Sequence, residues 1–186
     1  MASKVRAHVR GQRSQSMVEF AIVAPLLLLL IFVMVDFGRV IYTYITLNQA
    51  VNEAVRVAIR DSALLPTNGD VESAAKIHAV DVNLANPCAN GPITTAAPPP
   101  NQGWIYITEP NPPSVVETLS PTLQNAPGGQ RWAVDNGTCS ATNPAFNHAP
   151  LQVTIRYHFV PMTPLINQFI TSNLVISAAA VYRTEY

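Results

Sequence analysis

The chain has 186 residues, enough for one domain-sized unit, with 48% hydrophobic and only 12% charged residues. Disordered chains combine low hydrophobicity with high net charge, so this composition excludes a wholly disordered protein. The formal net charge is zero, but an excess of positive charge stands near the N-terminus, where residues 1–16 hold four basic and no acidic side chains: Lys4, Arg6, Arg10 and Arg13. Because this excess is confined to one short segment, a nucleic-acid-binding protein is not expected.

An apolar run follows the basic segment. Residues 20–35 contain no charged side chain, and residues 26–33 are leucine, isoleucine, phenylalanine or valine throughout. As a helix, residues 20–35 would be about 24 Å long, and counting from Met17 gives about 28 Å, close to the ~30 Å thickness of a hydrocarbon core. This length fits both a membrane span and the core of a signal peptide.

The residues after the run favour the membrane span. A signal peptide ends in small residues before its cleavage site, whereas this chain continues as Asp-Phe-Gly-Arg at positions 36–39. We therefore expect a retained span over about residues 17–36. The basic segment 1–14 would stay in the cytoplasm, and everything after Asp36 would lie outside it. A signal peptide is the alternative.

The helix is predicted to continue beyond the membrane. Pro25 should kink or loosen one turn, as membrane helices tolerate, and the next proline is Pro66. The sequence therefore predicts one helix from near Gln15 to near Asp61, with an amphipathic second half. The apolar positions of that half recur at helical spacing: Val40, Tyr44, Leu47, Val51, Ala54, Val55 and Ala58.

The remaining residues, 62–186, are expected to form an extracytoplasmic head. A short helix is predicted from Asp70, as its N-cap, to about Asn86, with Pro87 just beyond it. Residues 87–150 contain 12 of the 16 prolines. Because proline is excluded from helix interiors and central strands, loops with short strands are expected there, such as residues 104–108 and 131–134.

The last part of the head carries the strongest strand pattern. Apolar and polar residues alternate strictly from Leu151 to Phe159, which predicts a strand with one buried face and one solvent-exposed face that includes His158. A short amphipathic helix over 163–172 and a final strand over 174–186 should follow. The two strands would pair antiparallel and cover the outer half of the long helix. The predicted fold class is α+β, a long helix packed on a small antiparallel sheet.

Catalysis, a metal and a cofactor are not expected. The histidines belong to no H-E-x-x-H motif, and no phosphate-binding loop or G-x-S-x-G motif is present. Asn136-Gly137 reads as a tight turn rather than a calcium or glycosylation site. The aromatic residues Trp104, Tyr106 and Trp132 would fill a small core or, as the alternative, form a binding patch.

The two cysteines of the chain are Cys88 and Cys139. Both lie in the part expected in an oxidising compartment, so a disulfide that closes the intervening loop is predicted, with two free thiols as the alternative. Neither belongs to a C-x-x-C pair, which argues against redox catalysis and zinc binding.

The N-terminal third resembles TadE-like proteins, the pseudopilins or minor pilins of the tight-adherence branch of type IV pilus systems. The resemblance rests on Ser-Met-Val-Glu-Phe-Ala-Ile-Val-Ala-Pro at positions 16–25, the leucine run, and the segments 36–39, 42–44 and 50–58. It implies a pilin-like fold and a non-enzymatic role in assembling or anchoring a tight-adherence pilus, with cell adhesion as the outcome. A permanently anchored ectodomain that binds an envelope partner or carbohydrate is the alternative.

The resemblance also implies processing by a prepilin peptidase. The cut would fall after Ser14, so that Gln15 becomes the N-terminus and Glu19 the fifth residue. The family usually has glycine before the cut, and this chain has serine, so an unprocessed chain stays the alternative. Glu19 would pair with the amine of a neighbouring subunit, or, in an unprocessed chain, reach the headgroups near the start of the helix.

The expected partners follow from the resemblance and from the span. They are membrane lipid, other pilin or pseudopilin subunits, the prepilin peptidase and pilus platform proteins. Against other subunits the apolar span would supply the packing surface. The span residues singled out for this role are Phe20, Pro25, Leu26 and Val35.

Overall fold

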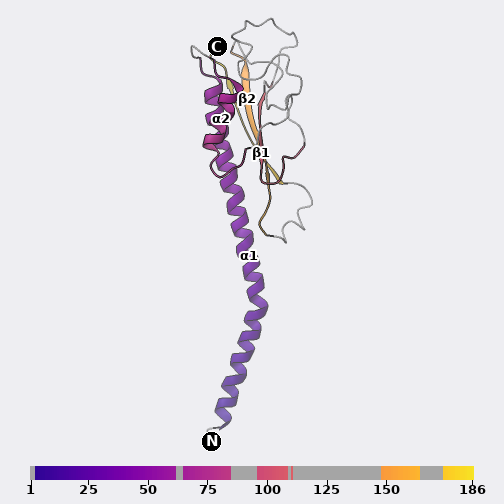
Figure 1. Cartoon of the computed structure of the whole chain (residues 1–186). Coiled ribbons are helices and arrows are strands. Elements are labelled where there is room, and N and C mark those ends of the chain that lie inside the picture. The colour runs from indigo at the N-terminus through magenta and orange to yellow at the C-terminus, as the bar shows by residue number, and fades with distance from the viewer. Residues whose placement is uncertain (1–2, 62–64, 85–95, 109, 111–147, 164–173) are drawn as a thin grey trace. The chain divides into compact units, whose positions relative to one another are not determined.

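The computed structural model describes residues 3–61, 65–84, 96–108, 110, 148–163 and 174–186. The chain divides into two units, Met1–Arg39 with Pro161–Phe169, and Val40–Val160 with Ile170–Tyr186. The elements are, in chain order, α1 (Ser3–Ala58), α2 (Asn68–His78), β1 (Gly103–Thr108), β2 (Pro150–Phe159) and β3 (Leu174–Arg183) (Figure 1). A long N-terminal helix with a small antiparallel sheet is the α+β, pilin-like fold that the sequence predicts.

The helix α1 is continuous over 56 residues and includes Pro25. The predicted kink or loosened turn does not interrupt it, although proline leaves the carbonyl four residues earlier without its usual partner. The helix begins at Ser3 rather than near Gln15, and residues 3–14 contain no proline that would interrupt it. It ends at Ala58 rather than near Asp61.

The end of α1 is capped by residues from β3's C-terminal extension. The Tyr186 hydroxyl donates to the carbonyl of Ala58 at 3.1 Å, and the backbone N–H of Glu185 donates to that of Ile59 at 3.0 Å. These donors satisfy carbonyls that a helix end leaves without intrahelical partners. Burial raises the pKa of the Tyr186 phenol, which therefore stays protonated and able to donate at neutral pH.

The core of the second unit lies along one face of α1. The buried residues of α1 follow each other at intervals of one, three or four, the pattern of a single helical face. They form one cluster with residues of the sheet, including Ile105 and Ile155, and with Val71 and Ala75 of α2. The predicted amphipathic second half of α1 is therefore confirmed from Leu47 onward, whereas Tyr44, predicted on the apolar face, is 51% exposed. The buried hydrophobic residues of this half are Leu47, Ala50, Val51, Ala54, Val55 and Ala58.

The helix α2 differs from its prediction at both ends. Its N-cap is Thr67, and Asp70 is the third residue of the helix, where the two side chains form a capping box. The Thr67 hydroxyl accepts from the backbone N–H of Asp70, and the Asp70 carboxylate accepts from the backbone N–H of Thr67. An Asp N-cap without this partner would satisfy only one of the two N–H groups. The helix ends at His78 rather than near Asn86. Shortly after it, Asp81 has a positive φ of 61°, a conformation that does not continue a helix.

The three strands form one antiparallel sheet in the order β1-β2-β3. Ile155 of β2 is the register partner of Ile105 in β1 and of Ala178 in β3. The strands predicted at 104–108 and 151–159 are confirmed, and so is the antiparallel pairing of β2 with the final strand. That strand ends at Arg183 rather than at Tyr186.

The prediction of a solvent-exposed face on β2 is wrong. Thr154 is only 3% exposed and His158 only 9%, because β2 is the central strand and residues 96–98 contact its second face. His158 Nδ1 lies 2.8 Å from the carbonyl oxygen of Pro98, and Arg156 donates to that of Ala96 at 3.1 Å. Thr154 and His158 are therefore buried, whereas Gln152 and Arg156 on the same face stay partly exposed.

Other predicted features fall outside the described residues. They are the strand at 131–134, the turn at Asn136, Trp132, both cysteines and all but the first residue of the helix expected over 163–172. Of the aromatic residues on β1, Tyr106 is fully buried and Trp104 packs against the core. This agrees with the interpretation of these two as core residues.

Candidate functional site

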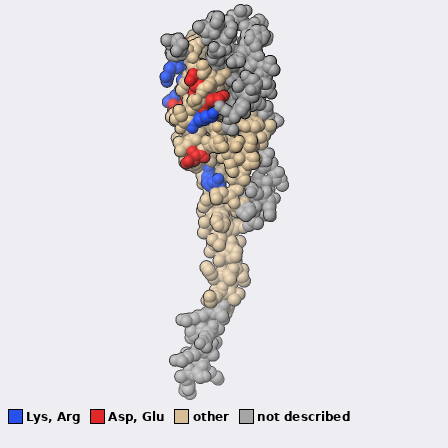
Figure 2. All heavy atoms as spheres, viewed as in Figure 1, with Lys and Arg blue, Asp and Glu red and all other residues tan. Residues whose placement is uncertain are grey.

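The most extensive exposed surface of α1 is its apolar first half. Every large hydrophobic side chain from Met17 to Val35 is between 40% and 75% exposed, including the predicted span residues Phe20 at 68%, Leu26 at 68% and Val35 at 52%. Acidic and basic side chains gather over α2 and the second half of α1 (Figure 2). Such a long apolar surface is costly in water, so it requires lipid or protein contact.

This part of α1 is long and apolar enough to cross a membrane. The described residues contain one candidate span, within Gln15–Ala58, and none of its most apolar window is buried inside the protein. A buried core helix would be apolar because it packs inside its own domain, whereas the most apolar window of this helix is not buried within the described chain. The helix therefore fits a single-pass membrane anchor.

The predicted assembly residue Glu19 lies at the beginning of the apolar half. Its Oε1 accepts a hydrogen bond from Gln15 Nε2 at 3.3 Å, and the pair is exposed. The two residues are four positions apart, so they share one face of α1. The structure thus brings together two predicted site residues. The side chain of Ser14 lies outside the described residues.

A polar centre that the sequence analysis did not identify lies at Asp36. This side chain is only 4% exposed, and its Oδ2 accepts from the hydroxyl of Thr163 at 2.6 Å and from its backbone N–H at 3.0 Å. Its Oδ1 accepts from the backbone N–H of Met162 at 3.0 Å and from Arg39 at 3.2 Å. We call this group, Asp36 with Arg39, Met162 and Thr163, the Asp36 cluster.

The Asp36 cluster explains how a carboxylate is tolerated at the end of an apolar run. A buried charge is unfavourable unless it is paired and hydrogen-bonded. A carboxylate has about four acceptor sites, and the four donors around Asp36 occupy them. The separations of 126 and 127 residues between the partners leave no local sequence signal for the cluster.

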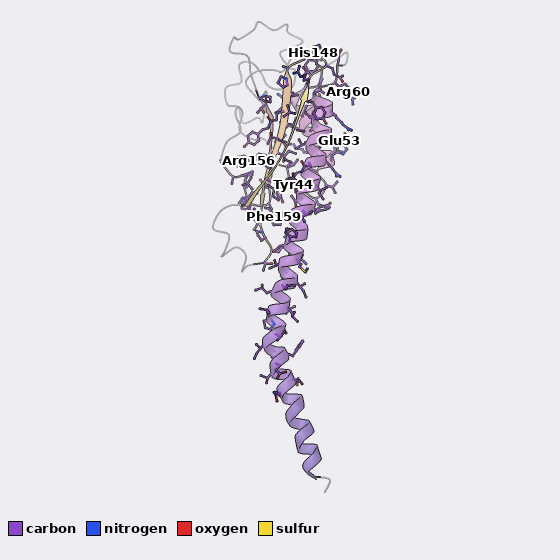
Figure 3. The ribbon with its side chains drawn as sticks, turned by 180° about the vertical axis from the view of Figure 1, so that it is seen from behind. Tyr44, Glu53, Arg60, His148, Arg156 and Phe159 are labelled. Atoms are coloured by element: carbon purple, nitrogen blue, oxygen red, sulfur yellow. The ribbon has the colours of Figure 1, made fainter. Side chains whose placement is uncertain are left out.

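Polar side chains of the second unit do not converge on a reactive group among the described residues. Arg56 pairs with Glu53 at 3.2 Å on the exposed face of α1. His148 Nδ1 lies 3.0 Å from the carbonyl oxygen of Thr184, and Figure 3 shows it at the same end of α1 as Arg60. Arg156 belongs to the sheet, away from both (Figure 3). The hydrogen bonds of Arg56, Glu53 and His148 are thus contacts within the fold.

Metal and disulfide chemistry find no support in the described part of the chain. No group of three or more His, Cys, Asp or Glu side chains able to hold a metal occurs there. Cys88 and Cys139 lie outside it, so the predicted disulfide stays a prediction.

Comparison with known protein families matches part of α1. Residues 15–56 match the family model of TadE-like proteins, a segment that lies wholly within α1. No curated protein and no solved structure matches the chain. TadE-like proteins are generally structural rather than enzymatic. The resemblance is therefore confirmed over residues 15–56, the part of the chain that is similar to TadE-like proteins.

Proposed function

We propose that the protein is a non-enzymatic minor pilin or pseudopilin that assists the assembly or anchoring of a tight-adherence type IV pilus. The observation that carries the proposal is the exposed apolar half of α1 within the segment that matches the TadE-like family. The same helix continues into the buried core of the second unit. A subunit built in this way stores an apolar surface in the membrane and presents a folded head.

The proposed topology places residues 1–14 in the cytoplasm and the head, residues 62–186, outside it. Four basic side chains precede the apolar run, and such residues are enriched on the cytoplasmic side of spans. The long helix α1 joins the two, with its span at about 17–36. The proline-rich residues 87–150 would supply loops of the head.

The proposed assembly step uses Glu19. When the subunit leaves the membrane, Phe20 to Val35 would pack against the helices of other pilin subunits. Processing after Ser14 would create an amine at Gln15, and a neighbouring subunit's amine would then replace the amide of Gln15 as the partner of Glu19. Cleavage would be the work of a prepilin peptidase, and pilus platform proteins would drive the extraction.

The test is intact-mass and N-terminal analysis of the protein from native membranes and from a sheared surface fraction. We expect a chain that begins at Gln15 in the sheared fraction. A Glu19→Gln variant should be processed and remain in the membrane, because it keeps the size of the side chain but loses the charge. Glu53→Gln, which removes a charge on the exposed face of the same helix, is the matched control and should still reach the sheared fraction.

The second candidate function is a permanently anchored ectodomain that binds an envelope partner or carbohydrate. The serine at position 14, where the family usually has glycine, favours this function because it disfavours processing. A chain that keeps residues 1–14 and occurs only in membranes would contradict the pilin proposal and support the anchored ectodomain.

A further inference from the structure

The segment Pro161–Thr163 is fixed to α1 at the position where the apolar run ends. Asp36 is the first charged residue after Glu19, and its carboxylate binds two consecutive backbone N–H groups of this segment, each at 3.0 Å. The Thr163 hydroxyl adds a third contact at 2.6 Å. Charge-assisted hydrogen bonds of this kind are roughly twice as strong as neutral ones. These contacts therefore fix the position of the segment along the axis of α1, beside Asp36.

Within this segment, Met162 contacts Asp36 through its backbone N–H, and its side chain is exposed. Thr163 is 6% exposed, whereas Met162 is 74% exposed, among the highest values for a large hydrophobic side chain in the described chain. Phe37, which follows Asp36 on α1, is 66% exposed. The sequence carries no charged residue from 159 to 182. Exposed apolar side chains thus continue past Val35 and onto a second segment.

We propose that Pro161–Thr163 is a second lipid-contacting element, which places Met162 in the headgroup layer where α1 leaves the bilayer. The inference rests on the proposed function, since it requires α1 to span the membrane. The helix from Met17 to Val35 is about 28 Å long, which matches the hydrocarbon thickness of ~30 Å and puts Asp36 at the boundary. Hydrogen bonds of 3.0 Å to Asp36 hold Met162 at the same boundary.

Charge favours lipid over a second copy of the chain as the occupant. Arg39 lies beside the same carboxylate, and its side chain is 39% exposed. A partly exposed guanidinium at this height suits the headgroup layer, where its charge can reach lipid phosphates while its aliphatic part stays on apolar surface. Packing another apolar helix against the same surface would remove this charge from water, which is unfavourable without a further acidic partner.

The test uses photocrosslinking of the full chain in vesicles of phosphatidylcholine and phosphatidylglycerol. The residue p-benzoylphenylalanine replaces Met162, and mass spectrometry identifies what it captures. Leu29 in the span is the lipid-facing control position, and Asn52, about 24 Å beyond Asp36 along α1, is the water-facing one. We expect lipid adducts at position 162 at about the Leu29 level and about tenfold above the Asn52 level.

A second variant tests the role of the carboxylate. Asp36→Asn keeps the size of the side chain but loses the charge and one acceptor, so lipid capture at position 162 should fall about threefold or more, with capture at Leu29 unchanged. Asp61→Asn is the control for removal of a charge. Unchanged capture at position 162 in Asp36→Asn would overturn the assignment of Asp36 as the residue that holds this element at the membrane.

The outcomes separate this inference from the proposed function. Capture of a second copy at position 162, or no capture there while Leu29 captures lipid, would overturn the inference and leave the membrane anchor in place. A chain in which Leu29 also captures no lipid would contradict the anchor itself, and the inference with it.

Discussion

At the scale of single residues, Gly103 is, of the three glycines that the structure describes, the one where an added methyl group has the least room. A Cβ there would lie 2.7 Å from Cδ2 of Leu84 and 3.3 Å from the backbone oxygen of Arg156. Leu84 is 7% exposed, so it cannot move aside without disturbing the core. Overpacking of this kind costs about 1–3 kcal/mol. We expect Gly103→Ala to lower the free energy of unfolding by that amount, measured by urea denaturation of the detergent-solubilised protein.

Gly69→Ala is the matched control for this substitution. A Cβ at position 69 would lie 3.6 Å from the Thr67 hydroxyl, an ordinary contact. Since Gly69 is inside α2, alanine should leave stability unchanged or raise it by up to about 1 kcal/mol. Equal destabilisation by the two substitutions would contradict the crowding at Gly103 as the cause.

At the scale of elements, the capping box of α2 predicts a pH-dependent contribution to stability. Asp70 accepts from the backbone N–H and the hydroxyl of Thr67, each at 2.8 Å. The backbone hydrogen bond from Thr67, followed by the one from its side chain, lowers the pKa of Asp70 below its usual value. A lowered pKa in the folded state means that the contribution is complete above the unfolded-state pKa of about 3.9. It is lost as the pH falls through the folded pKa.

We therefore expect Asp70→Asn to be less stable than the parent chain at pH 7, by about 0.5–1 kcal/mol. The difference should shrink as the pH falls below about 4, because protonation removes the charge from the parent as well. Denaturation curves at several pH values measure it. Glu72→Gln, which removes a charge on the same helix but outside the box, should show no such loss. A pH-independent difference for Asp70→Asn would contradict the ionic contribution.

The elements also show what local sequence patterns could and could not predict. Strict alternation predicts β2, but the burial of His158 on its second face depends on a segment 60 residues away, where the carbonyl oxygen of Pro98 lies beside the imidazole. The Thr67-x-x-Asp70 pattern was a local signal for the N-terminus of α2, and reading Asp70 alone as the cap missed it. The Asp36 cluster could not be predicted, because Met162 and Thr163 lie 126 and 127 residues from Asp36 and only the folded chain brings them together.

At the scale of the whole molecule, α1 has an exposed apolar first half and a second half that packs in the core, and the two halves differ in sequence pattern. The apolar residues of α1 before Asp36 have no spacing preference and are exposed on all sides, which suits lipid or neighbouring helices. The buried apolar residues from Leu47 to Ala58 follow helical spacing, because they pack in one core with the sheet and α2. Hydropathy and periodicity were thus sufficient to predict the long helix and the fold class, but the three-stranded order needed contacts between distant segments.

This division predicts where the chain can be shortened. A chain of residues 40–186 keeps all the α1 residues that enter the core, such as Leu47, Val51 and Val55, each 0–1% exposed, and loses the exposed apolar run. We expect it to fold without detergent and to unfold cooperatively. A chain of residues 60–186 loses every core residue that α1 supplies. Truncating one buried leucine alone costs about 2–5 kcal/mol, so loss of the six buried hydrophobic residues of α1 should abolish folding.

Dispersed amide resonances in a two-dimensional NMR spectrum measure the difference between the two shortened chains. They should be present for residues 40–186 and absent for residues 60–186. Gly38→Ala in the full chain, where an added Cβ meets nothing within 4 Å, should leave folding unchanged and serves as a control for alteration near the division. If residues 60–186 fold as well as the longer chain, the second half of α1 is not a structural part of the head. The apolar helix would then be an anchor alone, and the head would be held by the sheet and α2.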